Sequence, residues 1–393
     1  MRMVELGEVA AIDRESIIPS EIRTGTKYLG LENVYSDGTA LPVDVEQGEL
    51  LSNKFVFGPN HLLYGKLRPY LSKITLPDFE GICSTDIIPI LPDANKLEKR
   101  YLYYYLRTPW MIETAVKACS GANLPRVDPK LLAQFKIPLP PLPEQRRIAA
   151  ILDKAQALVA NDKRTLAVYD QLAKSLFLEM FGDGNPDVRE WPLVELKDLV
   201  SSAPNSLRSG PFGSDLLHSE FVDEGVAVLG IDNAVENRFS WKGRRFITHE
   251  KYNELKRYTV RPGDVLITIM ATIGRSAVVP ADIGPAINSK HLAAITLDQS
   301  KANPAFISFS IHSDERVIHQ LFARSRGAIM SGLNLSLIKE VKLRLPPIDV
   351  QEHFCQALSR IERDKALATE SLHQSEALFG SLLQGAFSGS LGR

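Results

Sequence analysis

The sequence predicts an α+β protein built from two similar halves, each a mixed α/β domain followed by one long helix. A proline-rich segment that leads into a helical pattern occurs twice, as LPPLPEQRRIAAILDKAQAL from Leu139 and as LPPIDVQEHFCQALSRIERD from Leu345, 206 residues later. Each half also begins with segments such as LLYGKLRPYLSKITL and VLITIMATIGRSAVV, whose β-branched and aromatic residues are typical of strands. Such an ordered self-match indicates a duplicated unit.

The repeat extends well beyond the proline-rich segments. Phe181 aligns with Phe387 at the same offset of 206. Upstream the offset drifts to 200, where YLGLEN at Tyr28 matches VLGIDN at Val228, and then to 190, where VELGEV matches VELKDL. An offset that drifts while the order is kept indicates insertions into a duplicated domain-plus-helix.

Both halves close with a predicted long helix. Pro143 and Glu144 suit the first turn of one helix, and Asp349 suits the N-cap of the other. Apolar residues follow at alternating steps of three and four, which is the coiled-coil pattern. The predicted seam residues are Ile148, Ile151, Ala155, Leu158, Asp162, Thr165, Tyr169, Leu172 and Leu176 in the first helix, and Phe354, Leu358, Ile361, Ala368, Leu372, Leu378 and Leu382 in the second.

Helices of this length need a partner. The stretch 144–180 would span about 55 Å at ~1.5 Å per residue. We expect the two helices to pack antiparallel and to separate the two domains; the alternative is that each lies on its own domain. The predicted boundaries are 1–141 and 185–347 for the domains, and 142–184 and 348–390 for the helices.

The composition, 44% hydrophobic and 24% charged, is that of an ordinary globular protein. The net charge of −1 argues against a general polyanion binder but leaves room for local basic surfaces. The chain has neither an apolar run of the roughly 18 residues that a membrane span needs nor a signal-peptide pattern, so we expect a cytoplasmic protein without membrane contact. Three dispersed cysteines, Cys83, Cys119 and Cys355, indicate neither a disulfide framework nor a zinc site.

Motifs for catalysis are missing from the sequence. It contains no GxxxxGK[ST] phosphate loop, no NPP[YF] tetrapeptide and no glycine-rich turn for S-adenosylmethionine. Asp187, Glu195 and Lys197 spell the PD…(D/E)xK pattern of metal-dependent nucleases, but Asp187 falls in the predicted linker after the first long helix. We therefore predict no catalytic and no metal-ligating residues, with an autonomous nuclease as a minor alternative.

The duplicated halves, the segment PLPPLPEQRRIAAILD and the long helices together resemble the specificity subunit of type I restriction–modification systems. The most specific stretch runs from Gly121 to Asp153, where a glycine loop leads through IPLPPLPEQ into the helix. The second copy keeps Pro346, Pro347 and Gln351 but has IDV where the first has LPE. LGLENV and LGIDNA also resemble the early strand of that family's target-recognition domains.

The resemblance implies two target-recognition domains, about Met1–Pro141 and Trp191–Pro347, each reading one half of a bipartite site in double-stranded DNA. The helices would set the distance between the half-sites and dock methyltransferase subunits, expected to be two, and a restriction/translocase subunit would complete the complex. The chain itself would bind no cofactor, with S-adenosylmethionine, ATP and Mg expected on the partners. The competing interpretation is a coiled-coil protein-assembly adaptor without DNA recognition.

Candidate DNA contacts are basic and polar residues in loops, because Lys and Arg bind phosphates and polar side chains read base edges. They are Lys66, Arg68, Tyr70, Lys73, Asn123 and Arg126 in the first domain, and Arg275, Ser289, Lys290, Arg324, Arg326 and Asn334 in the second. Candidate residues of the spacer and of partner docking are Gln145, Ile148, Ile151, Leu152, Leu158, Leu172, Gln351, Phe354, Leu358 and Ile361.

Overall fold

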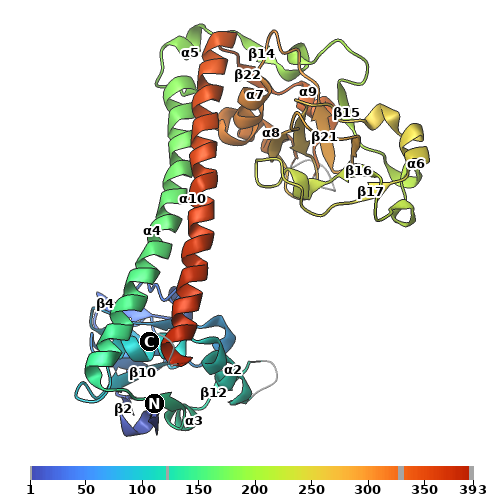
Figure 1. The fold of residues 1–393 in the computed structure, drawn as a ribbon. Coiled ribbons are helices and arrows are strands. Elements are labelled where there is room, and N and C mark those ends of the chain that lie inside the picture. The colour runs from blue at the N-terminus through green and yellow to red at the C-terminus, as the bar shows by residue number, and fades with distance from the viewer. Residues whose placement is uncertain (1, 121–123, 326–331, 389–393) are drawn as a thin grey trace. The chain divides into compact units, whose positions relative to one another are not determined.

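The computed structural model describes residues 2–120, 124–325 and 332–388. The chain divides into two compact units, one comprising Met1–Thr165 and Ala368–Arg393 and the other Leu166–Leu367. Each unit holds one mixed α/β domain and a part of each of two long helices, α4 (Leu142–Phe181) and α10 (Ile348–Ser388) (Figure 1). The predicted α+β class with an internal repeat is confirmed.

The domain of the first unit has two main sheets. One is antiparallel with the strand order β2-β10-β7-β8, and the other has the order β3-β6-β9-β4-β5, in which β4 and β9 run parallel. The elements are β1 (Met3–Glu5), β2 (Ala10–Ile12), β3 (Ser16–Ile17), β4 (Thr26–Leu29), β5 (Val43–Val45), β6 (Lys54–Phe57), β7 (Leu62–Gly65), β8 (Ile74–Thr75), β9 (Gly81–Cys83), β10 (Ile87–Pro92), α1 (Lys99–Leu106), α2 (Pro109–Lys117), β11 (Cys119–Ser120), β12 (Arg126–Val127), α3 (Pro129–Ala133) and β13 (Lys136–Pro138).

The domain of the second unit repeats this plan. Its antiparallel sheet has the order β15-β21-β18-β19, and its second sheet has the order β17-β16-β20, with β16 and β20 parallel like β4 and β9. The elements are α5 (Asp187–Glu190), β14 (Leu193–Glu195), β15 (Leu207–Ser209), β16 (Val226–Leu229), β17 (Phe246–Ile247), α6 (His249–Glu254), β18 (Val265–Thr268), β19 (Ser276–Val278), β20 (Ala286–Asn288), β21 (Leu292–Ile295), α7 (Pro304–Ser313), α8 (Glu315–Ser325), α9 (Leu335–Lys339) and β22 (Lys342–Arg344). The pairs β1–β13 and β14–β22 close the two domains alike.

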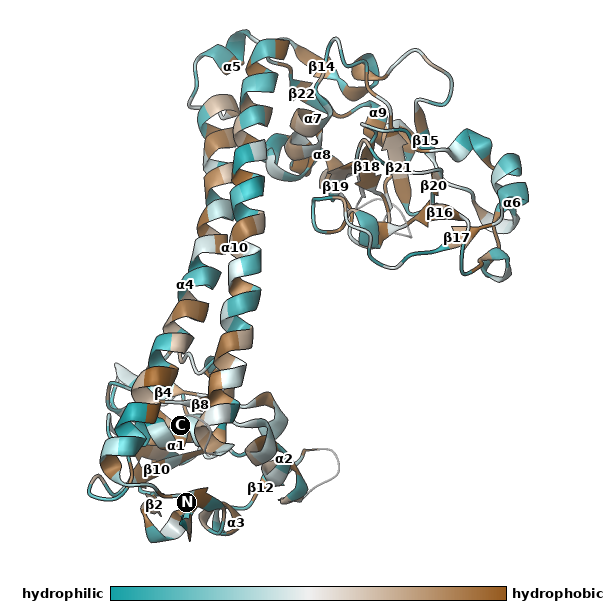
Figure 2. Cartoon of the chain, viewed as in Figure 1, coloured by the Kyte–Doolittle hydropathy of each residue, from teal (hydrophilic) through white to brown (hydrophobic). Residues whose placement is uncertain are grey.

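The helices α4 and α10 are antiparallel. In the second unit Lys365 of α10 binds Asp170 of α4 at 2.5 Å, and the ring of Phe354 lies 5.6 Å from that of Phe177. A later residue of α4 thus contacts an earlier residue of α10, which is the antiparallel arrangement. Apolar and polar residues alternate around both helices (Figure 2). No helix in the described ranges is long and apolar enough to cross a membrane.

The seam of α4 differs from the predicted one at two positions, Leu158 and Leu172. Leu158 and Leu172 are 50% and 47% exposed, whereas Ala173 is 6% exposed and packs in the core of the second unit. At Leu172 the prediction chose the larger leucine beside the small inward Ala173. Helices that pack closely favour small residues between them. In α10 the predicted Leu378 is 46% exposed, and its neighbour Phe379 packs inward.

One buried glutamine in each half joins a long helix to its domain. Gln145 is fully buried, and its Oε1 accepts from the backbone N–H of Glu98 at 2.8 Å. Its Nε2 donates to the carbonyls of Lys96 and Pro140 at 2.9 and 2.8 Å. One side chain thereby ties together the start of α4, the proline segment before it and the start of α1.

Gln351 makes the equivalent bonds in the second half. It accepts from Asn303 N–H at 2.9 Å and donates to the carbonyls of Lys301 and Pro346 at 3.2 and 2.8 Å. These bonds give the reason for the glutamine that follows each proline pair. Only an amide offers an acceptor and two donors at one point.

The glutamine bonds predict a large loss of stability when they are removed. In a Gln145→Leu variant one buried N–H and two carbonyls lose their partner, at about 1–3 kcal/mol for each group left unsatisfied. We expect the free energy of unfolding to fall by about 2–4 kcal/mol in a urea titration. The matched control, Gln171→Leu at an exposed site on the same helix, should leave the midpoint unchanged. Equal midpoints for the two variants would contradict the assigned role.

The corrected seam predicts opposite results at two adjacent residues. Ala173→Asp places a carboxylate in the core beside Phe177, where an unpaired charge is costly, so we expect strong destabilisation. Leu172→Asp points to solvent and should change the melting temperature little. Thermal denaturation followed by circular dichroism measures both. If Leu172→Asp were the more damaging change, the seam first predicted from the sequence would be right.

Candidate nucleic-acid interface

Two loops of the first domain lie against each other beyond the end of β7. The backbone N–H of Val127 donates to the carbonyl of Lys66 at 3.0 Å, and that of Arg68 donates to the carbonyl of Pro125 at 2.8 Å. Leu67 and Arg126 form a β-bridge between the same loops. Lys66, Arg68 and Arg126, three of the predicted DNA contacts, are brought together in this way. We call the surface made by Lys66, Arg68, Tyr70, Asp86 and Arg126 the first loop edge.

The first loop edge contains a strained turn. Arg68 and Ser72 have left-handed backbones, with φ of 52° and 49°, on either side of the short helix Pro69–Leu71. Such conformations cost roughly 1–3 kcal/mol each for residues other than glycine and concentrate at functional sites. The Arg68 side chain is exposed. The turn therefore lowers the stability of the fold, and its backbone holds the Arg68 cation at the surface.

Two predicted contacts in this loop have different surroundings. Tyr70 is 53% exposed, so its ring is not part of the domain core. Lys73 turns inward, and its Nζ donates to the carbonyl of Leu31 at 2.5 Å. The ammonium of Lys73 thus joins two segments of its own domain, whereas we expected it to be free for a phosphate.

Asp86 is the residue of this edge that the sequence analysis missed. Its Oδ1 lies 3.5 Å from Lys66 Nζ and 3.5 Å from Arg126 Nε. The predicted contacts were basic and polar residues in loops, whereas Asp86 is an acid in the turn between β9 and β10. The backbone N–H of Lys66 fixes it there by donating to its carbonyl at 2.9 Å.

The second domain carries an equivalent turn between β18 and β19. Thr268 is fully buried, and its Oγ1 accepts from the N–H of Arg275 at 3.0 Å, which closes the turn. Ala271 has a left-handed φ of 61°, as Arg68 has in the first domain, and Met270 forms a β-bridge with Gly332. Arg275 is exposed at the end of this turn. We call the surface made by Arg275, Ser289, Lys290, His291 and Asn334 the second loop edge.

Ser289 and Lys290 follow β20, and the glycine Gly210 makes their position possible. A Cβ at Gly210 would lie 2.0 Å from the carbonyl oxygen of Asn288, so only glycine allows this close approach. Lys290 is exposed, whereas the hydroxyl of Ser289 is buried and has no hydrogen-bond partner within the described ranges. Burial, followed by the charges of Lys290 and Arg245, lowers the pKa of His291 below its usual value.

The remaining predicted contacts are only partly described. Asn123 and Arg326 lie outside the described residues, and the same is true of the side chain of Arg324, whose backbone lies in the last turn of α8. Asn334 is exposed and caps α9, because its Oδ1 accepts from Leu337 N–H at 2.9 Å. Its amide NH₂ has no recorded partner among the described residues.

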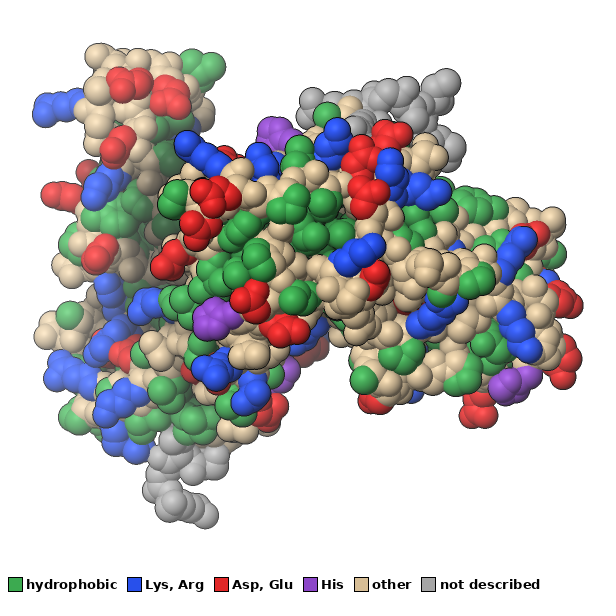
Figure 3. Space-filling view, turned by 90° about the horizontal axis from the view of Figure 1, so that it is seen from above, with side chains coloured by type: hydrophobic (Ala, Val, Ile, Leu, Met, Phe, Trp, Pro, Cys, Tyr) green, Lys and Arg blue, Asp and Glu red, His purple; other side chains and the backbone are tan. Residues whose placement is uncertain are grey.

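Charges of both signs are interspersed over the face seen in Figure 3, with apolar side chains between them. This mixture agrees with the net charge of −1. The cations of the two loop edges are therefore local features.

The residues predicted for the spacer and for docking fall into two groups. Gln145, Ile148, Leu152, Gln351, Phe354 and Ile361 are buried by the chain itself, while Ile151 and Leu358 are partly buried. Leu158 and Leu172 are about half exposed. Only the last two of these side chains offer substantial apolar surface to another molecule.

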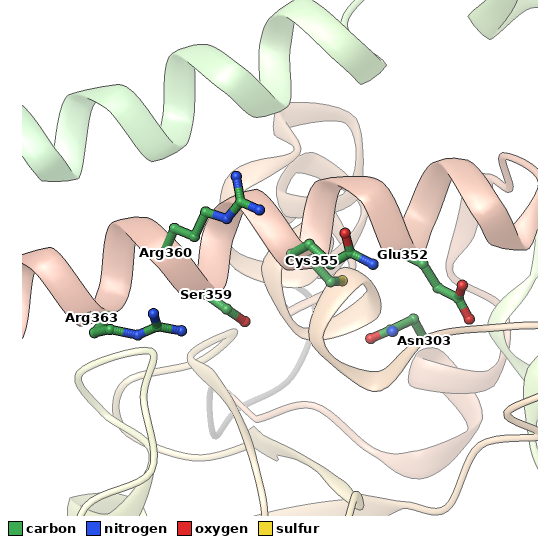
Figure 4. Close-up of a pocket in the computed structure, with 7 residues that line it drawn as sticks. Asn303, Glu352, Cys355, Ser359, Arg360 and Arg363 are labelled. Atoms are coloured by element: carbon green, nitrogen blue, oxygen red, sulfur yellow. The ribbon is translucent and has the colours of Figure 1, made fainter.

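A cavity of about 500 Å³ lies beside the first turns of α10 (Figure 4). It is lined by Asn303, Glu352, Cys355, Gln356, Ser359, Arg360 and Arg363. Burial raises the pKa of the Cys355 thiol to about 11, so this thiol is protonated at neutral pH and is a poor nucleophile. In the close-up, Arg360 points toward α4, on the opposite side of α10 from Asn303.

The first half has larger, paired side chains at two equivalent positions. There Arg100 Nη1 binds Asp153 Oδ2 at 2.6 Å, and the hydroxyl of Tyr104 donates to the same carboxylate at 2.7 Å. In the second half Ala305 stands in place of Arg100 and Ser359 in place of Asp153. Of these two smaller side chains, Ser359 lines the cavity.

The PD…(D/E)xK residues do not assemble a metal site. Glu195 pairs with Lys197 and, at 3.7 Å, with Lys342, while Asp187 starts the short helix α5. Within the described ranges no three acidic, histidine or cysteine side chains are grouped in a way that could hold a metal ion. The nuclease alternative therefore has no geometric support in this part of the chain.

Comparison with known proteins points to one family. The family model described as type I restriction modification DNA specificity domain matches residues 1–168 and 190–376. A similar curated protein is the type I restriction enzyme MjaVIII specificity subunit of Methanocaldococcus jannaschii, 24% identical over 305 residues, which cover 72% of this chain and 68% of that protein.

Solved structures share the fold. The type I restriction–modification S subunit from M. genitalium aligns over 98% of this chain and 96% of its own with a TM-score of 0.64 at 13% identity. A chain from a structure titled for complex assembly and conformational transition of the type I R-M system aligns over 99% of this chain and 98% of its own, with a TM-score of 0.61 at 20% identity. With two matched domains and the repeated fold, this chain belongs to the family of type I restriction–modification DNA specificity subunits.

Proposed function

We propose that this chain reads a bipartite sequence in double-stranded DNA, with one half-site for each domain. The observation that carries the proposal is the repeated loop edge. In both domains a left-handed, non-glycine residue, Arg68 or Ala271, follows the equivalent strand, and the same turn carries an exposed arginine, Arg68 or Arg275. A strained turn that recurs with different side chains suits a common scaffold that reads two different half-sites.

The chemistry of the edges suits DNA. Arg68, Arg126, Arg275 and Lys290 can bind phosphates, which supply affinity without sequence information. Specificity would come from polar groups placed between these cations and facing the major groove. Specificity subunits of type I systems are not catalytic, and we propose the same for this chain.

We further propose that the helix pair spaces the domains and docks methyltransferase subunits. Half-sites on one face of DNA repeat about every 34 Å. Helices of 40 and 41 residues are about 60 Å long at ~1.5 Å per residue, enough for such a spacing. On α4 in the second unit, Val168, Leu172 and Leu178 are 56%, 47% and 56% exposed, and apolar side chains on an outer helix face favour protein docking.

The reacting groups would come from other chains. Two methyltransferase subunits, one for each half of the repeat, would bring S-adenosylmethionine, and a restriction subunit would bring ATP and Mg²⁺. A protein-assembly adaptor without DNA recognition is the alternative, and the loop edges argue against it because an adaptor gains nothing from strained cationic turns. If partner capture survived while no DNA bound, the adaptor would be the better description.

The DNA-reading proposal predicts a defined salt effect for Arg68→Ala. Loss of one phosphate contact should weaken binding and reduce the slope of log K against log salt by about 0.9. Fluorescence anisotropy with a labelled duplex at several salt concentrations measures both quantities. Arg189→Ala, an exposed arginine on α5, serves as the matched control. An unchanged slope in Arg68→Ala would remove this residue from the interface.

The docking proposal predicts that Leu172→Asp disrupts assembly without unfolding the chain. A carboxylate in an apolar contact must lose its water, so we expect markedly less methyltransferase subunit to be retained in a pull-down. Gln171→Asp changes the charge by the same amount one residue away and should retain the partner. Normal retention by Leu172→Asp would place the docking surface elsewhere.

A further inference from the structure

We propose that Asp86 is a specificity-determining residue of the first domain, whose carboxylate accepts a hydrogen bond from the amino group of a cytosine or an adenine in the major groove. The inference rests on the proposed DNA-reading function and names the chemistry that one half-site must offer. Three observations support it: the position of Asp86 at the first loop edge, its ion pairs with Lys66 and Arg126, and its carboxylate oxygen Oδ2, which accepts no side-chain hydrogen bond within the described ranges.

The backbone holds Asp86 at the first loop edge. Its carbonyl accepts from Lys66 N–H at 2.9 Å, and its own N–H donates to Ser84 Oγ at 3.2 Å. The next residue, Ile87, donates to the carbonyl of Ser84 at 2.9 Å. The turn between β9 and β10 is thus closed on both sides, which orients the carboxylate toward the loops that carry Lys66 and Arg126.

Both ion pairs of Asp86 use the same oxygen. Oδ1 is the oxygen nearest to Lys66 and to Arg126, and within the described ranges no side chain donates a hydrogen bond to Oδ2. The Asp86 side chain is 29% exposed, so solvent or a ligand can reach it. An ionised carboxylate can only accept hydrogen bonds, so the free oxygen selects for a donor.

The two flanking cations indicate what kind of donor that is. Lys66 and Arg126 attract phosphates, whereas Asp86 repels them, so the carboxylate fits a base edge between two phosphate contacts. In the major groove the base-edge donors are the N4 amino group of cytosine and the N6 amino group of adenine. Guanine and thymine present acceptors at this edge, which a carboxylate rejects.

The second domain presents different chemistry at the equivalent place. Ile269 N–H donates to the carbonyl of His291 at 2.9 Å, as Lys66 N–H donates to that of Asp86. A histidine with Lys290 beside it therefore stands where the first domain has a carboxylate. Asp86 and His291 differ in chemistry, so the two domains would favour different bases at this position of their half-sites.

Two measurements on Asp86→Asn test the proposal, both with the full chain. The first is binding to a duplex of random sequence, where loss of the repelling charge should tighten binding on the order of threefold to tenfold. The second is a genome-wide map of adenine methylation in cells that also carry the methyltransferase partner. There we expect one position of one half-site to lose its preference for C or A, a discrimination that is worth roughly fivefold to 150-fold in the wild type.

Controls separate the possible outcomes. Asp78→Asn, an exposed acid of the same domain, should change neither result. Asp86→Glu keeps the charge and moves the oxygen, so it should disturb the same motif position without tightening random binding, even if Asp86→Asn misfolds. An unchanged motif in both Asp86 variants overturns the proposal, including the case where only random binding tightens. A wild-type chain that binds no DNA and directs no methylation overturns the DNA-reading function itself.

Discussion

The hydrogen bonds of one buried glutamine in each half are the constraint on which the architecture depends. Gln145 and Gln351 each satisfy a helix N-terminus, a loop carbonyl and the carbonyl of a proline, so the long helix leaves its domain in one direction. Prolines alone would stiffen the segment without setting its angle, because they offer no donor. The amide fixes the angle at which the long helix follows the stiff proline segment, as the proposed spacer role requires.

On this shared scaffold the two halves have diverged in side-chain size and charge. Arg100 pairs with Asp153 where the second half has Ala305 and Ser359, and Ser359 lines a cavity of about 500 Å³. The surfaces at these two places therefore differ, even though the backbones repeat. These side-chain differences leave the sheets and the hydrogen bonds of Gln145 and Gln351 unchanged.

The loop edges show how a chain of net charge −1 can present surfaces that suit DNA. Lys66 and Arg126 form a local cationic surface, and Asp86 partly neutralises it. Under the proposed DNA-reading function, a carboxylate among these cations would lower the affinity for DNA in general and make binding depend on the base beside it. Specificity is a difference between affinities, so a repulsive element is as useful as an attractive one.

The sequence by itself determined the duplication, the α+β class and the presence of both long helices, because proline pairs and apolar spacing act locally along the chain. It also marked Lys66, Arg68 and Arg126, whose loops the structure joins. Only the tertiary structure decided that Asp86 meets two of these cations, and that Lys73 turns inward to a carbonyl. The reason is physical: a residue's helical or strand preference depends on its neighbours in sequence, whereas an ion pair depends on which distant strands come together.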